Sequence, residues 1–241
     1  MLLPRVIPCL LVHEKGLVKS VKFKDYKYVG DPINAVKIFN EKKVDELMVL
    51  DIDASVEGYA PDMRMIKNLA EECRMPLCYG GGIKTVEQAG SIINLGVEKI
   101  AISSAAVEDP ELISGISKEL GSQSVIVVLD VKKKLSGKYE ILIHNGKKAT
   151  GLELFDYLKL LVEKGAGEIV LNSIDHDGMM KGYDFKLAEA VYKAISIPLV
   201  VMGGCGSLDD IKKLIAETGT IGAAAGSLFV FKGPHKAVLI N

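Results

Sequence analysis

The sequence predicts an α/β fold, a (β/α)8 TIM barrel made by a single domain. Short apolar runs rich in β-branched residues alternate with amphipathic segments along the chain, which is typical of βα units around a parallel sheet. The length of 241 residues suits one barrel. Glycine-rich turns follow several of the apolar runs. A doubly wound open sheet is the alternative, because the number of strands alone does not prove that a barrel closes.

The expected elements follow in order along the chain. Eight apolar runs are predicted strands, at 5–11, 46–51, 76–79, 98–102, 124–130, 168–172, 198–201 and 221–225. Seven amphipathic segments are predicted helices, at 32–43, 61–73, 84–95, 109–119, 151–164, 183–194 and 207–217.

Several helix boundaries carry local signals. The Asp-Pro dipeptides at 31–32 and 109–110 are typical of an N-terminal cap followed by proline at the first helical position. Gly96 and Gly165 are typical of the residue that follows a helix C-terminus. The ending from Phe231 onward leaves little room for an eighth helix of full length.

Two insertions interrupt the alternation of strands and helices. Residues 12–30 are predicted to form a long loop that carries Lys15, Lys19, Lys22, Lys24 and Lys27. A lysine of this loop could contact a phosphate, and the alternative is a solvated basic lid. Residues 131–149 are predicted to form a hairpin with its turn at Asn145-Gly146, which covers the barrel mouth or contacts a partner.

Composition and charge narrow the classes of partner. The net charge of −1 gives no indication of nucleic acid or an anionic membrane, and no apolar run approaches the ~18 residues that span a bilayer. Pro4, Arg5 and Pro8 interrupt the apolar start, which argues against a secretory signal. The 4 cysteines lack CxxC spacing and the 4 histidines lack metal-ligand spacing. We expect a cytoplasmic protein with reduced thiols, no metal and no cofactor.

The stretch 198–231 predicts an anion-binding site. One apolar run ends in the glycine-rich segment 203–206, the next ends in Gly226-Ser227, and helices are expected after both. Unpaired backbone N–H groups and helix N-termini stabilise an anion at such a place. Barrels of this class commonly bind phosphate after strands 7 and 8. Two ordinary glycine turns are the alternative interpretation.

The two halves of the chain, about 1–121 and 122–241, resemble each other at a spacing of about 120 residues. The repeat predicts a second anion site at the ends of strands 3 and 4. Two such sites across one barrel mouth suit a ligand with a phosphate at each end. The matching segments are 80–83 and 203–206, 103–106 and 226–227, and 51–53 and 174–178.

Charged residues stand at the starts of four predicted strands, where an apolar core is expected. Buried charges are tolerated when they are paired, so a structural plug at the barrel bottom and a polar gate to the barrel axis are both open. These residues are Arg5, Glu46, Lys99 and Glu168.

Taken together, these features resemble the family of the cyclase subunit of imidazole glycerol phosphate synthase. The resemblance extends from Arg5 to Phe229, most of the chain. Its motifs are Gly30-Asp31-Pro32, Asp45-Glu46-Leu47, Leu50-Asp51-Ile52, Gly80-Gly81-Gly82-Ile83, Ser104-Ala105-Ala106-Val107, Gly121-Ser122-Gln123, Gly165-Ala166-Gly167-Glu168-Ile169 and Asp175-His176-Asp177-Gly178.

The resemblance implies a barrel subunit that binds a bisphosphorylated ribonucleotide at its mouth. It also implies a heterodimer, in which a glutaminase subunit docks at the barrel bottom and supplies ammonia through the axis. The four charged residues would then be the ammonia gate, with Glu98 and Gln123 on the side that faces the glutaminase. The expected phosphate- and substrate-binding residues are Lys19, Asp51, Gly82, Ser103, Ser104, Asn172, Asp177, Gly178, Gly204, Gly226 and Ser227.

One departure from the family pattern affects catalysis. The family uses two aspartates, after strands 1 and 5, as an acid/base pair; Asp130 matches the second, whereas Leu11 stands at the position of the first. Leucine cannot transfer a proton, and loss of one such group costs roughly 10²–10⁴ in rate. Ser103, Asn172 and Met202 also replace the asparagine, threonine and serine that the family favours.

We therefore favour a divergent subunit that conducts ammonia and binds a phosphorylated ligand without complete cyclase chemistry. The sequence resembles paralogues that work with a glutaminase and an N-acetyl sugar amidotransferase in acetamidino-sugar and surface-polysaccharide synthesis. A working histidine-pathway cyclase/lyase is one alternative; it would make imidazole glycerol phosphate and AICAR ribonucleotide, with Asp130 or Asp51 carrying both proton transfers. A non-enzymatic protein that activates a glutaminase is the other.

Overall fold

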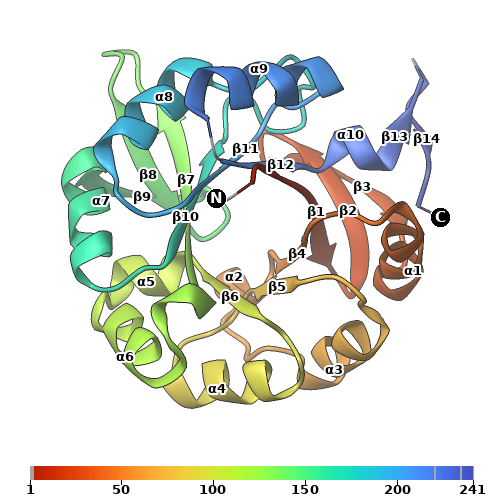
Figure 1. Ribbon diagram of the computed structural model, residues 1–241, viewed down its shortest axis with the longest axis horizontal. Helices are drawn as coiled ribbons and strands as arrows, with labels where there is room; N and C mark the ends of the chain where they lie inside the picture. Colours follow the sequence, from red (N-terminus) through yellow and green to blue (C-terminus); the bar gives the residue numbers. More distant parts are fainter. Residues whose placement is uncertain (1–2, 220, 234, 241) are drawn as a thin grey trace.

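The computed structural model describes residues 3–219, 221–233 and 235–240. Eight parallel strands form a closed barrel, since β1 pairs with both β4 and β12, and β7 pairs with both β6 and β10 (Figure 1). The closed pairing confirms the TIM barrel and excludes the open sheet. The barrel strands are β1 (Arg5–His13), β4 (Leu47–Asp51), β5 (Leu77–Gly80), β6 (Lys99–Ile102), β7 (Val125–Lys133), β10 (Glu168–Ser173), β11 (Leu199–Met202) and β12 (Gly222–Ala225).

The predicted helices form a ring outside the barrel (Figure 1). All of them are present, with ends that differ from the prediction by no more than three residues: α1 (Pro32–Lys42), α3 (Met63–Glu72), α4 (Val86–Asn94), α6 (Glu111–Leu120), α7 (Leu154–Glu163), α8 (Phe185–Ala194) and α9 (Leu208–Thr218). The helix expected after Gly226-Ser227 is the short α10 (Ser227–Val230). Three further short helices were not predicted from the sequence: α2 (Ala54–Glu57), α5 (Ser104–Glu108) and η1 (Ser122–Ser124).

The chain ends without a long eighth helix in its described part. The short α10 leads into a two-stranded sheet of β13 (Phe231–Lys232) and β14 (Ala237–Val238). Pro234 and Asn241, which belong to the predicted ending, lie outside the described residues, as do Met1 and Leu2 of the apolar start.

The predicted caps correspond to hydrogen bonds in the structure. Asp31 Oδ1 accepts from the N–H groups of Ile33 and Asn34 at 2.9 and 3.0 Å, which satisfies two free donors at the start of α1. The helix predicted from residue 109 begins two residues later, at Glu111, because Asp109 and Pro110 form the turn before it; Asp109 Oδ1 accepts from the Glu111 N–H at 3.1 Å.

The first insertion is a hairpin, so the prediction of a loop over 12–30 is wrong. Strand β1 continues to His13, and β2 (Gly16–Val21) and β3 (Lys24–Gly30) add to it antiparallel. Leu17 and Val18 are buried and anchor β2 against the core. The lysines suggest a solvent-exposed loop, although the apolar residues between them have the spacing of strands.

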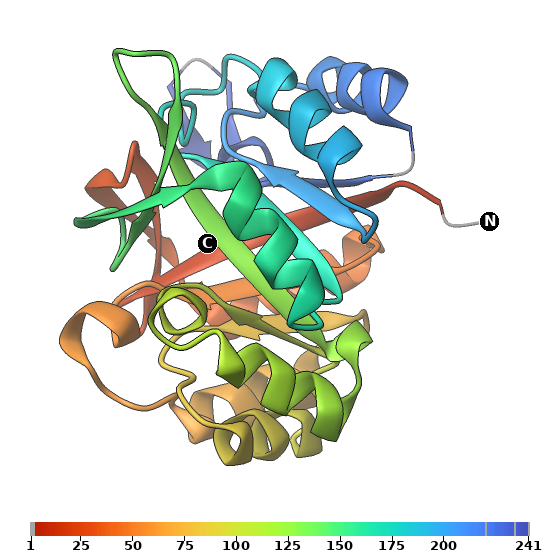
Figure 2. The ribbon, with the colours of Figure 1, turned by 90° about the vertical axis from the view of Figure 1, so that its left-hand side faces the viewer.

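The second insertion is a hairpin with its turn at Asn145-Gly146, as predicted, and it is longer than predicted. Strand β7 runs on to Lys133, followed by β8 (Tyr139–Ile143) and β9 (Lys148–Glu153), so helix α7 begins only at Leu154. Both insertions project from one end of the barrel, opposite the N-terminus (Figure 2). We call this the carboxyl end, because the strands finish there, and the other the amino end.

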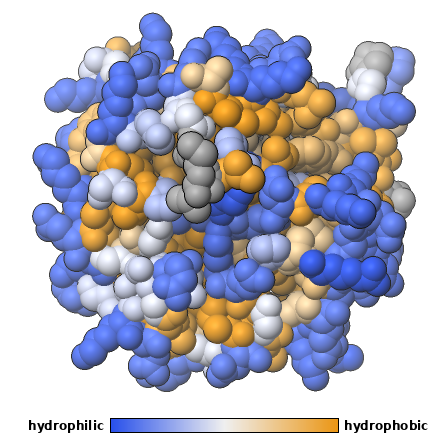
Figure 3. Space-filling view, viewed as in Figure 1, coloured by the Kyte–Doolittle hydropathy of each residue, from blue (hydrophilic) through white to orange (hydrophobic). Residues whose placement is uncertain are grey.

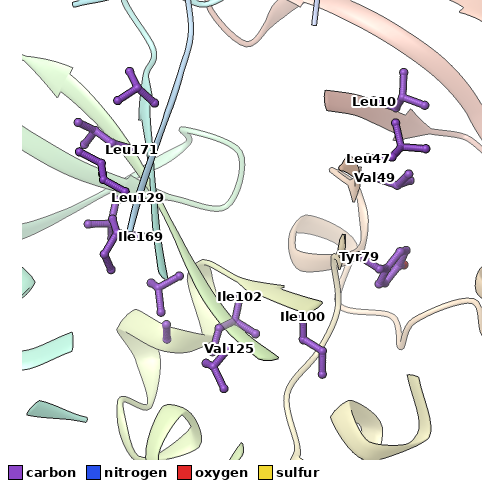
Figure 4. Packing of buried hydrophobic residues seen from close by; sticks show 14 of the residues in the cluster. Leu10, Leu47, Val49, Tyr79, Ile100, Ile102, Val125, Leu129, Ile169 and Leu171 are labelled. Carbon is purple, nitrogen blue, oxygen red and sulfur yellow. The ribbon is translucent and has the colours of Figure 1, made fainter. Parts of the chain in front are cut away.

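The core has two layers, one on each face of the barrel sheet. Between the sheet and the helices lie residues such as Leu10, Leu47, Tyr79 and Leu129 (Figure 4). A separate apolar cluster fills the inside of the barrel: Ile7, Cys9, Met48, Cys78, Ala101, Ile126, Val128, Val170, Val200, Met202 and Ala224, with Leu11 and Leu50 packed against it. The period-2 alternation of the strands separates the two layers.

Candidate functional site at the carboxyl end

A pocket of about 1380 Å³, part of it open to solvent, lies at the carboxyl end of the barrel. The structure brings together every residue predicted for phosphate binding, substrate binding or catalysis, since all of them line this pocket. They are Leu11, Lys19, Asp51, Gly82, Ser103, Ser104, Asp130, Asn172, Asp177, Gly178, Gly204, Gly226 and Ser227.

One side of the pocket is formed by glycine backbone and a buried lysine. Lys19 on β2 is 6% exposed, and its Nζ donates to the Cys9 carbonyl at 2.6 Å. A Cβ atom on Gly226 would lie 2.5 Å from Lys19 Nζ, so the ammonium group lies against the bare edge of that glycine. Gly204 has φ +103°, and a Cβ there would lie 2.1 Å from the Gly182 carbonyl oxygen. The close packing therefore requires glycine.

The opposite side contains the matching turn. Gly82 has φ +73°, and a Cβ there would lie 2.8 Å from the Tyr59 carbonyl oxygen. Ser104 begins α5 and is 7% exposed. Its Oγ accepts a hydrogen bond from the His144 backbone N–H at 2.9 Å. The turn of the second hairpin thus rests on this side of the pocket.

Apart from Lys19, the residues that the two hairpins bring to the pocket were not indicated by the sequence. His144 Nδ1 lies 2.9 Å from the Ser55 carbonyl oxygen, and His144 Nε2 lies 2.8 Å from Glu108 Oε1. Asn145 Nδ2 donates to the Tyr26 hydroxyl at 2.6 Å, which joins the second hairpin to the first. The predicted role of the second hairpin at the barrel mouth agrees with this position.

Asp130 lines the pocket from β7, three residues before that strand ends at Lys133. Burial raises the pKa of this carboxyl to about 7, although a hydrogen bond from Asn172 Nδ2 to Asp130 Oδ1, at 2.8 Å, favours the charged form. Asn172 is 4% exposed, and its Oδ1 has no hydrogen-bond partner among the described residues. An acceptor of this kind is available to an N–H or O–H group of a ligand.

Leu11 stands on β1, across the barrel from Asp130, and adds its side chain to the apolar interior with Leu50. No proton can be transferred at this position. The pocket centre therefore presents one carboxyl group to an apolar surface, rather than a pair of facing carboxyl groups.

The other two predicted aspartates of the pocket are held by neighbouring donors. Asp51 Oδ1 accepts from the Asp53 and Ala54 N–H groups at 3.0 and 3.1 Å, and from the Tyr59 hydroxyl at 3.0 Å. Asp177 Oδ2 accepts from Ser20 Oγ at 3.2 Å. Burial raises the pKa of both carboxyl groups, partly offset by these donors and, for Asp177, by Lys19.

The four charged residues form a closed ring at the amino end. Arg5 Nη1 lies 2.5 Å from Glu46 Oε2, and Arg5 Nη2 also pairs with Glu168 Oε1. Lys99 Nζ closes the ring at 2.7 Å from Glu46 Oε2 and 3.0 Å from Glu168 Oε2. The Glu46 and Glu168 side chains are 2% and 5% exposed, so the carboxylates are the buried members of the ring. Glu46 Oε1 has no hydrogen-bond partner among the described residues.

Two further observations concern metals and membranes. Within the described ranges, no three His, Cys, Asp or Glu side chains come together as a possible metal site. None of the described helices combines the length and the apolar character needed to cross a membrane.

Comparison with known proteins identifies the family. The profile of the family described as "Histidine biosynthesis protein" matches residues 5–235. A Leptospira borgpetersenii protein, provisionally named imidazole glycerol phosphate synthase subunit HisF, is 59% identical over 100% of this chain and 95% of its own length. A Pseudomonas aeruginosa protein, provisionally named subunit hisF2, is 50% identical over 98% of this chain and 94% of its own length. The HisF subunit of Alkaliphilus metalliredigens, which carries that name without qualification, is 39% identical over 95% of this chain and 91% of its own length. The chain therefore belongs to the histidine biosynthesis protein family and is a homologue of the imidazole glycerol phosphate synthase subunit HisF.

Proposed function

We propose that this protein is the barrel subunit of a glutamine amidotransferase system. In this proposal a glutaminase binds at the amino end as the second subunit of a heterodimer. Ammonia then passes through the ring of Arg5, Glu46, Lys99 and Glu168 and along the barrel axis. At the carboxyl end it meets a phosphorylated ligand in the pocket.

The observation that carries the proposal is the order in which three environments follow one another along the barrel axis. A ring of two cations and two anions closes the amino end, an apolar interior follows, and Asp130 and Asn172 lie at the carboxyl end. Glu168 and Asn172 are four residues apart on one face of β10, about 13 Å at strand spacing. Ammonia is uncharged, so an apolar interior admits it at much lower cost than it admits ammonium or another ion.

The amino-end surface suits a protein partner. Hydrophobic residues reach the surface around the centre of this face, whereas its rim is mostly hydrophilic (Figure 3). Such a distribution is typical of interfaces, which have an apolar core and a polar rim.

The pocket centre favours a role other than the family's cyclisation. With Leu11 in place of a carboxyl group, a second positioned acid/base group is missing opposite Asp130. We propose that the chain is a divergent paralogue that serves acetamidino-sugar synthesis for surface polysaccharides, together with an N-acetyl sugar amidotransferase. Relatives at 50–59% identity carry provisional names, whereas those at 38–40% are named as HisF subunits without qualification. This difference is expected if the chain and its more similar relatives form a branch separate from the HisF subunits.

A second candidate function is the cyclase and lyase reaction of histidine biosynthesis. One observation favours it: the pKa of Asp130, at about 7, suits a group that both gives and takes a proton at neutral pH. This function would require Asp130 to carry both transfers, because the Asp51 carboxylate is held by three donors.

The test is to mix the purified chain with candidate glutaminases, glutamine and the bisphosphorylated ribonucleotide of the family. We expect one glutaminase to bind and to hydrolyse glutamine faster, with no imidazole product at the rate of a histidine-pathway enzyme. Formation of imidazole product at that rate would contradict the proposal and establish the second candidate. A chain that neither binds nor stimulates any glutaminase would remove the basis of the channel.

A variant of the pocket sharpens this test. We expect Leu11→Asp to increase any residual cyclase activity by roughly 10²–10⁴, because it restores an acid/base group opposite Asp130. Leu11→Asn is the matched control, because asparagine has nearly the same size as aspartate and cannot transfer a proton. Absence of a gain would show that Asn172 and Met202 also block the reaction.

A further inference from the structure

The turn of the second hairpin is fastened to the rim of the pocket through one residue, His144. Its backbone N–H donates to Ser104 Oγ at 2.9 Å, and its ring contacts both α2 and α5. His144 also has φ +52°, a backbone conformation that residues other than glycine seldom adopt. Such a conformation persists where surrounding contacts hold it, as at ligand clamps and switches. The contacts of this one residue therefore decide where the turn lies.

Both ring nitrogens of His144 face oxygen atoms. Nδ1 lies 2.9 Å from the Ser55 carbonyl oxygen, and Nε2 lies 2.8 Å from Glu108 Oε1. A backbone carbonyl and an ionised carboxylate accept hydrogen bonds but donate none. A neutral imidazole has a single N–H and would turn a lone pair toward one of these oxygens, whereas an imidazolium donates to both. The two contacts together therefore require the imidazolium.

The contacts of two other histidines make no such demand. His13 Nδ1 lies 2.7 Å from Asp53 Oδ1, so one N–H satisfies that contact. His176 Nδ1 lies 2.9 Å from Ser173 Oγ, and a serine hydroxyl can itself donate. In the described part of the chain, only the His144 ring has an oxygen acceptor at each of its two nitrogens.

Glu108 is the one charged group that forms an ion pair with the His144 ring among the described residues. Titratable groups on the neighbouring elements are engaged elsewhere or are exposed. Asp53, just before α2, pairs with His13, and the Tyr26 hydroxyl accepts from Asn145. The exposed groups are Glu57, Lys84, Asp109 and Lys147. Solvent screens these charges, whereas Glu108, although its side chain is 45% exposed, acts through a direct hydrogen bond.

We propose that His144 is a pH-sensitive latch on the mouth of the pocket. As an imidazolium it holds the turn of the second hairpin against α2 and α5. When the ring, whose side chain is 27% exposed, gives a proton to solvent, one of its two contacts is lost and the turn moves away from the rim. The hydrogen bond of 2.6 Å from Asn145 to Tyr26, which joins the two hairpins, is then released as well.

The direction of the response follows from the chemistry of the ring. An unperturbed imidazole changes its charge between about pH 5 and pH 8. The latch is therefore closed in mildly acid solution and opens as the pH rises. This inference stands apart from the proposed function, because it requires neither ammonia nor a bound ligand.

The test measures hydrogen exchange of the His144 amide in the full chain from about pH 5.5 to about pH 8.5. The rate is expressed as protection relative to an unstructured peptide, which removes the pH dependence of exchange itself. We expect protection to fall about tenfold or more as the pH rises, because a charge-assisted hydrogen bond is lost. Nitrogen NMR of the labelled ring should show two N–H groups at the acid end and one at the alkaline end. Constant protection, or a ring with one N–H in the protected turn, would overturn the inference.

Glu108→Gln separates the latch from ordinary packing. The glutamine amide can donate to Nε2 of a neutral ring, while Nδ1–H still donates to the Ser55 carbonyl. We therefore expect the turn to stay protected at both ends of the pH range. Glu57→Gln alters an exposed carboxylate of α2 and should keep the pH dependence of the parent. A pH dependence in Glu108→Gln as large as in the parent would contradict the inference.

Removal of the ring provides the second variant. Asparagine tolerates the left-handed backbone of residue 144 but is too short to reach both acceptors. His144→Asn should therefore show low protection at every pH. His235→Gln removes an exposed histidine near the end of the chain and should behave as the parent does. If His144→Asn kept the pH dependence of the parent, another group would carry it and the latch would be refuted.

Discussion

Asp130 stands on β7 in surroundings that favour its neutral form. Burial raises its pKa to about 7, from roughly 3.9 in an unfolded chain. The folded protein therefore binds this proton more tightly than the unfolded chain does. The resulting stabilisation is fully present below about pH 4 and is lost as the pH rises through about 7.

We expect Asp130→Asn to remove this pH dependence. The free energy of unfolding of the parent protein should fall more steeply between about pH 4 and pH 8 than that of the variant, because only the parent must ionise a buried carboxyl group. Denaturant titration at a series of pH values measures both profiles. Parallel profiles would show that Asp130 is already ionised in the folded protein at acid pH.

The partner of Asp130 provides a second prediction at this scale. Asn172→Leu removes the amide donor that stabilises the carboxylate, so the pKa of Asp130 should rise further above its ordinary value. Carbon NMR of the labelled carboxyl group measures the midpoint directly. Asn172→Asp is unsuitable as a control, because it adds a second charge; Asn172→Gln, which keeps the amide, should shift the midpoint less. A midpoint that stays in place in Asn172→Leu would mean that this hydrogen bond does not bias the charge of Asp130.

The residues of the pocket that sequence reasoning found share a local signal. Apart from Lys19, which stands on the antiparallel strand β2, they lie in glycine turns or towards the carboxyl ends of strands, where the topology of a parallel barrel brings them to one end. His144, Ser20 and Phe23 lack such a signal, since their positions depend on how two hairpins fold across the mouth. Glu108 lacks it because it ends α5, a helix too short to show a period. Leu11 is visible as a departure from a family pattern, whereas its packing with Leu50 became apparent only in the structure.

At the scale of elements, the strands and helices that carry a clear hydrophobic period could be predicted to within a few residues. The hairpin of β2 and β3 could not, because its lysines suggested solvent exposure. Leu17 and Val18 of this hairpin are nevertheless buried. The short helices α2, α5 and α10 are too short to show a period, and they depend on the turns that precede them.

The cap of α1 gives a prediction at this scale. Asp31→Ala should lower the free energy of unfolding by about 1 kcal/mol, because two N–H groups at the start of the helix lose their acceptor. For a chain of this size the midpoint of thermal unfolding should fall by about 2–4 °C. Asp31→Asn keeps an acceptor and should retain most of the stability, and Glu71→Ala, on an exposed helix surface, is the neutral control. Equal losses in all three would argue against the cap.

At the scale of the whole molecule, the closed barrel places one antiparallel insertion on β1 and another on β7, two strands that lie opposite each other. This placement supports the proposal that residues 1–121 and 122–241 are two repeated half-barrels within one domain. Sequence similarity at a spacing of about 120 residues suggested the repeat. The sequence could not show how far each insertion extends, because the turns between their strands differ in length.

The ring at the amino end depends on all four side chains, and its disruption should affect the whole barrel. Lys99→Met leaves Glu46 and Glu168 with Arg5 as their remaining partner, and should lower the free energy of unfolding by up to about 3 kcal/mol. Adding Glu46→Gln should recover part of the loss, because one buried charge is removed with its partner. Lys67→Met, on the exposed surface of α3, is the control. A double variant that is less stable than the single variant would show that Glu46 does not depend on Lys99.

If ammonia passes through the ring as we propose, the balance of charge in the ring determines how nitrogen transfer responds to the solution. Two cations and two anions cancel at a distance, so the ring neither attracts nor repels an ion by its net charge, and it excludes ions of both signs through the cost of dehydrating them. Added salt, which weakens long-range fields, should therefore leave nitrogen transfer nearly constant. The pH, by contrast, governs the fraction of the nitrogen that is present as uncharged ammonia rather than ammonium. The pH should therefore set the rate of nitrogen transfer.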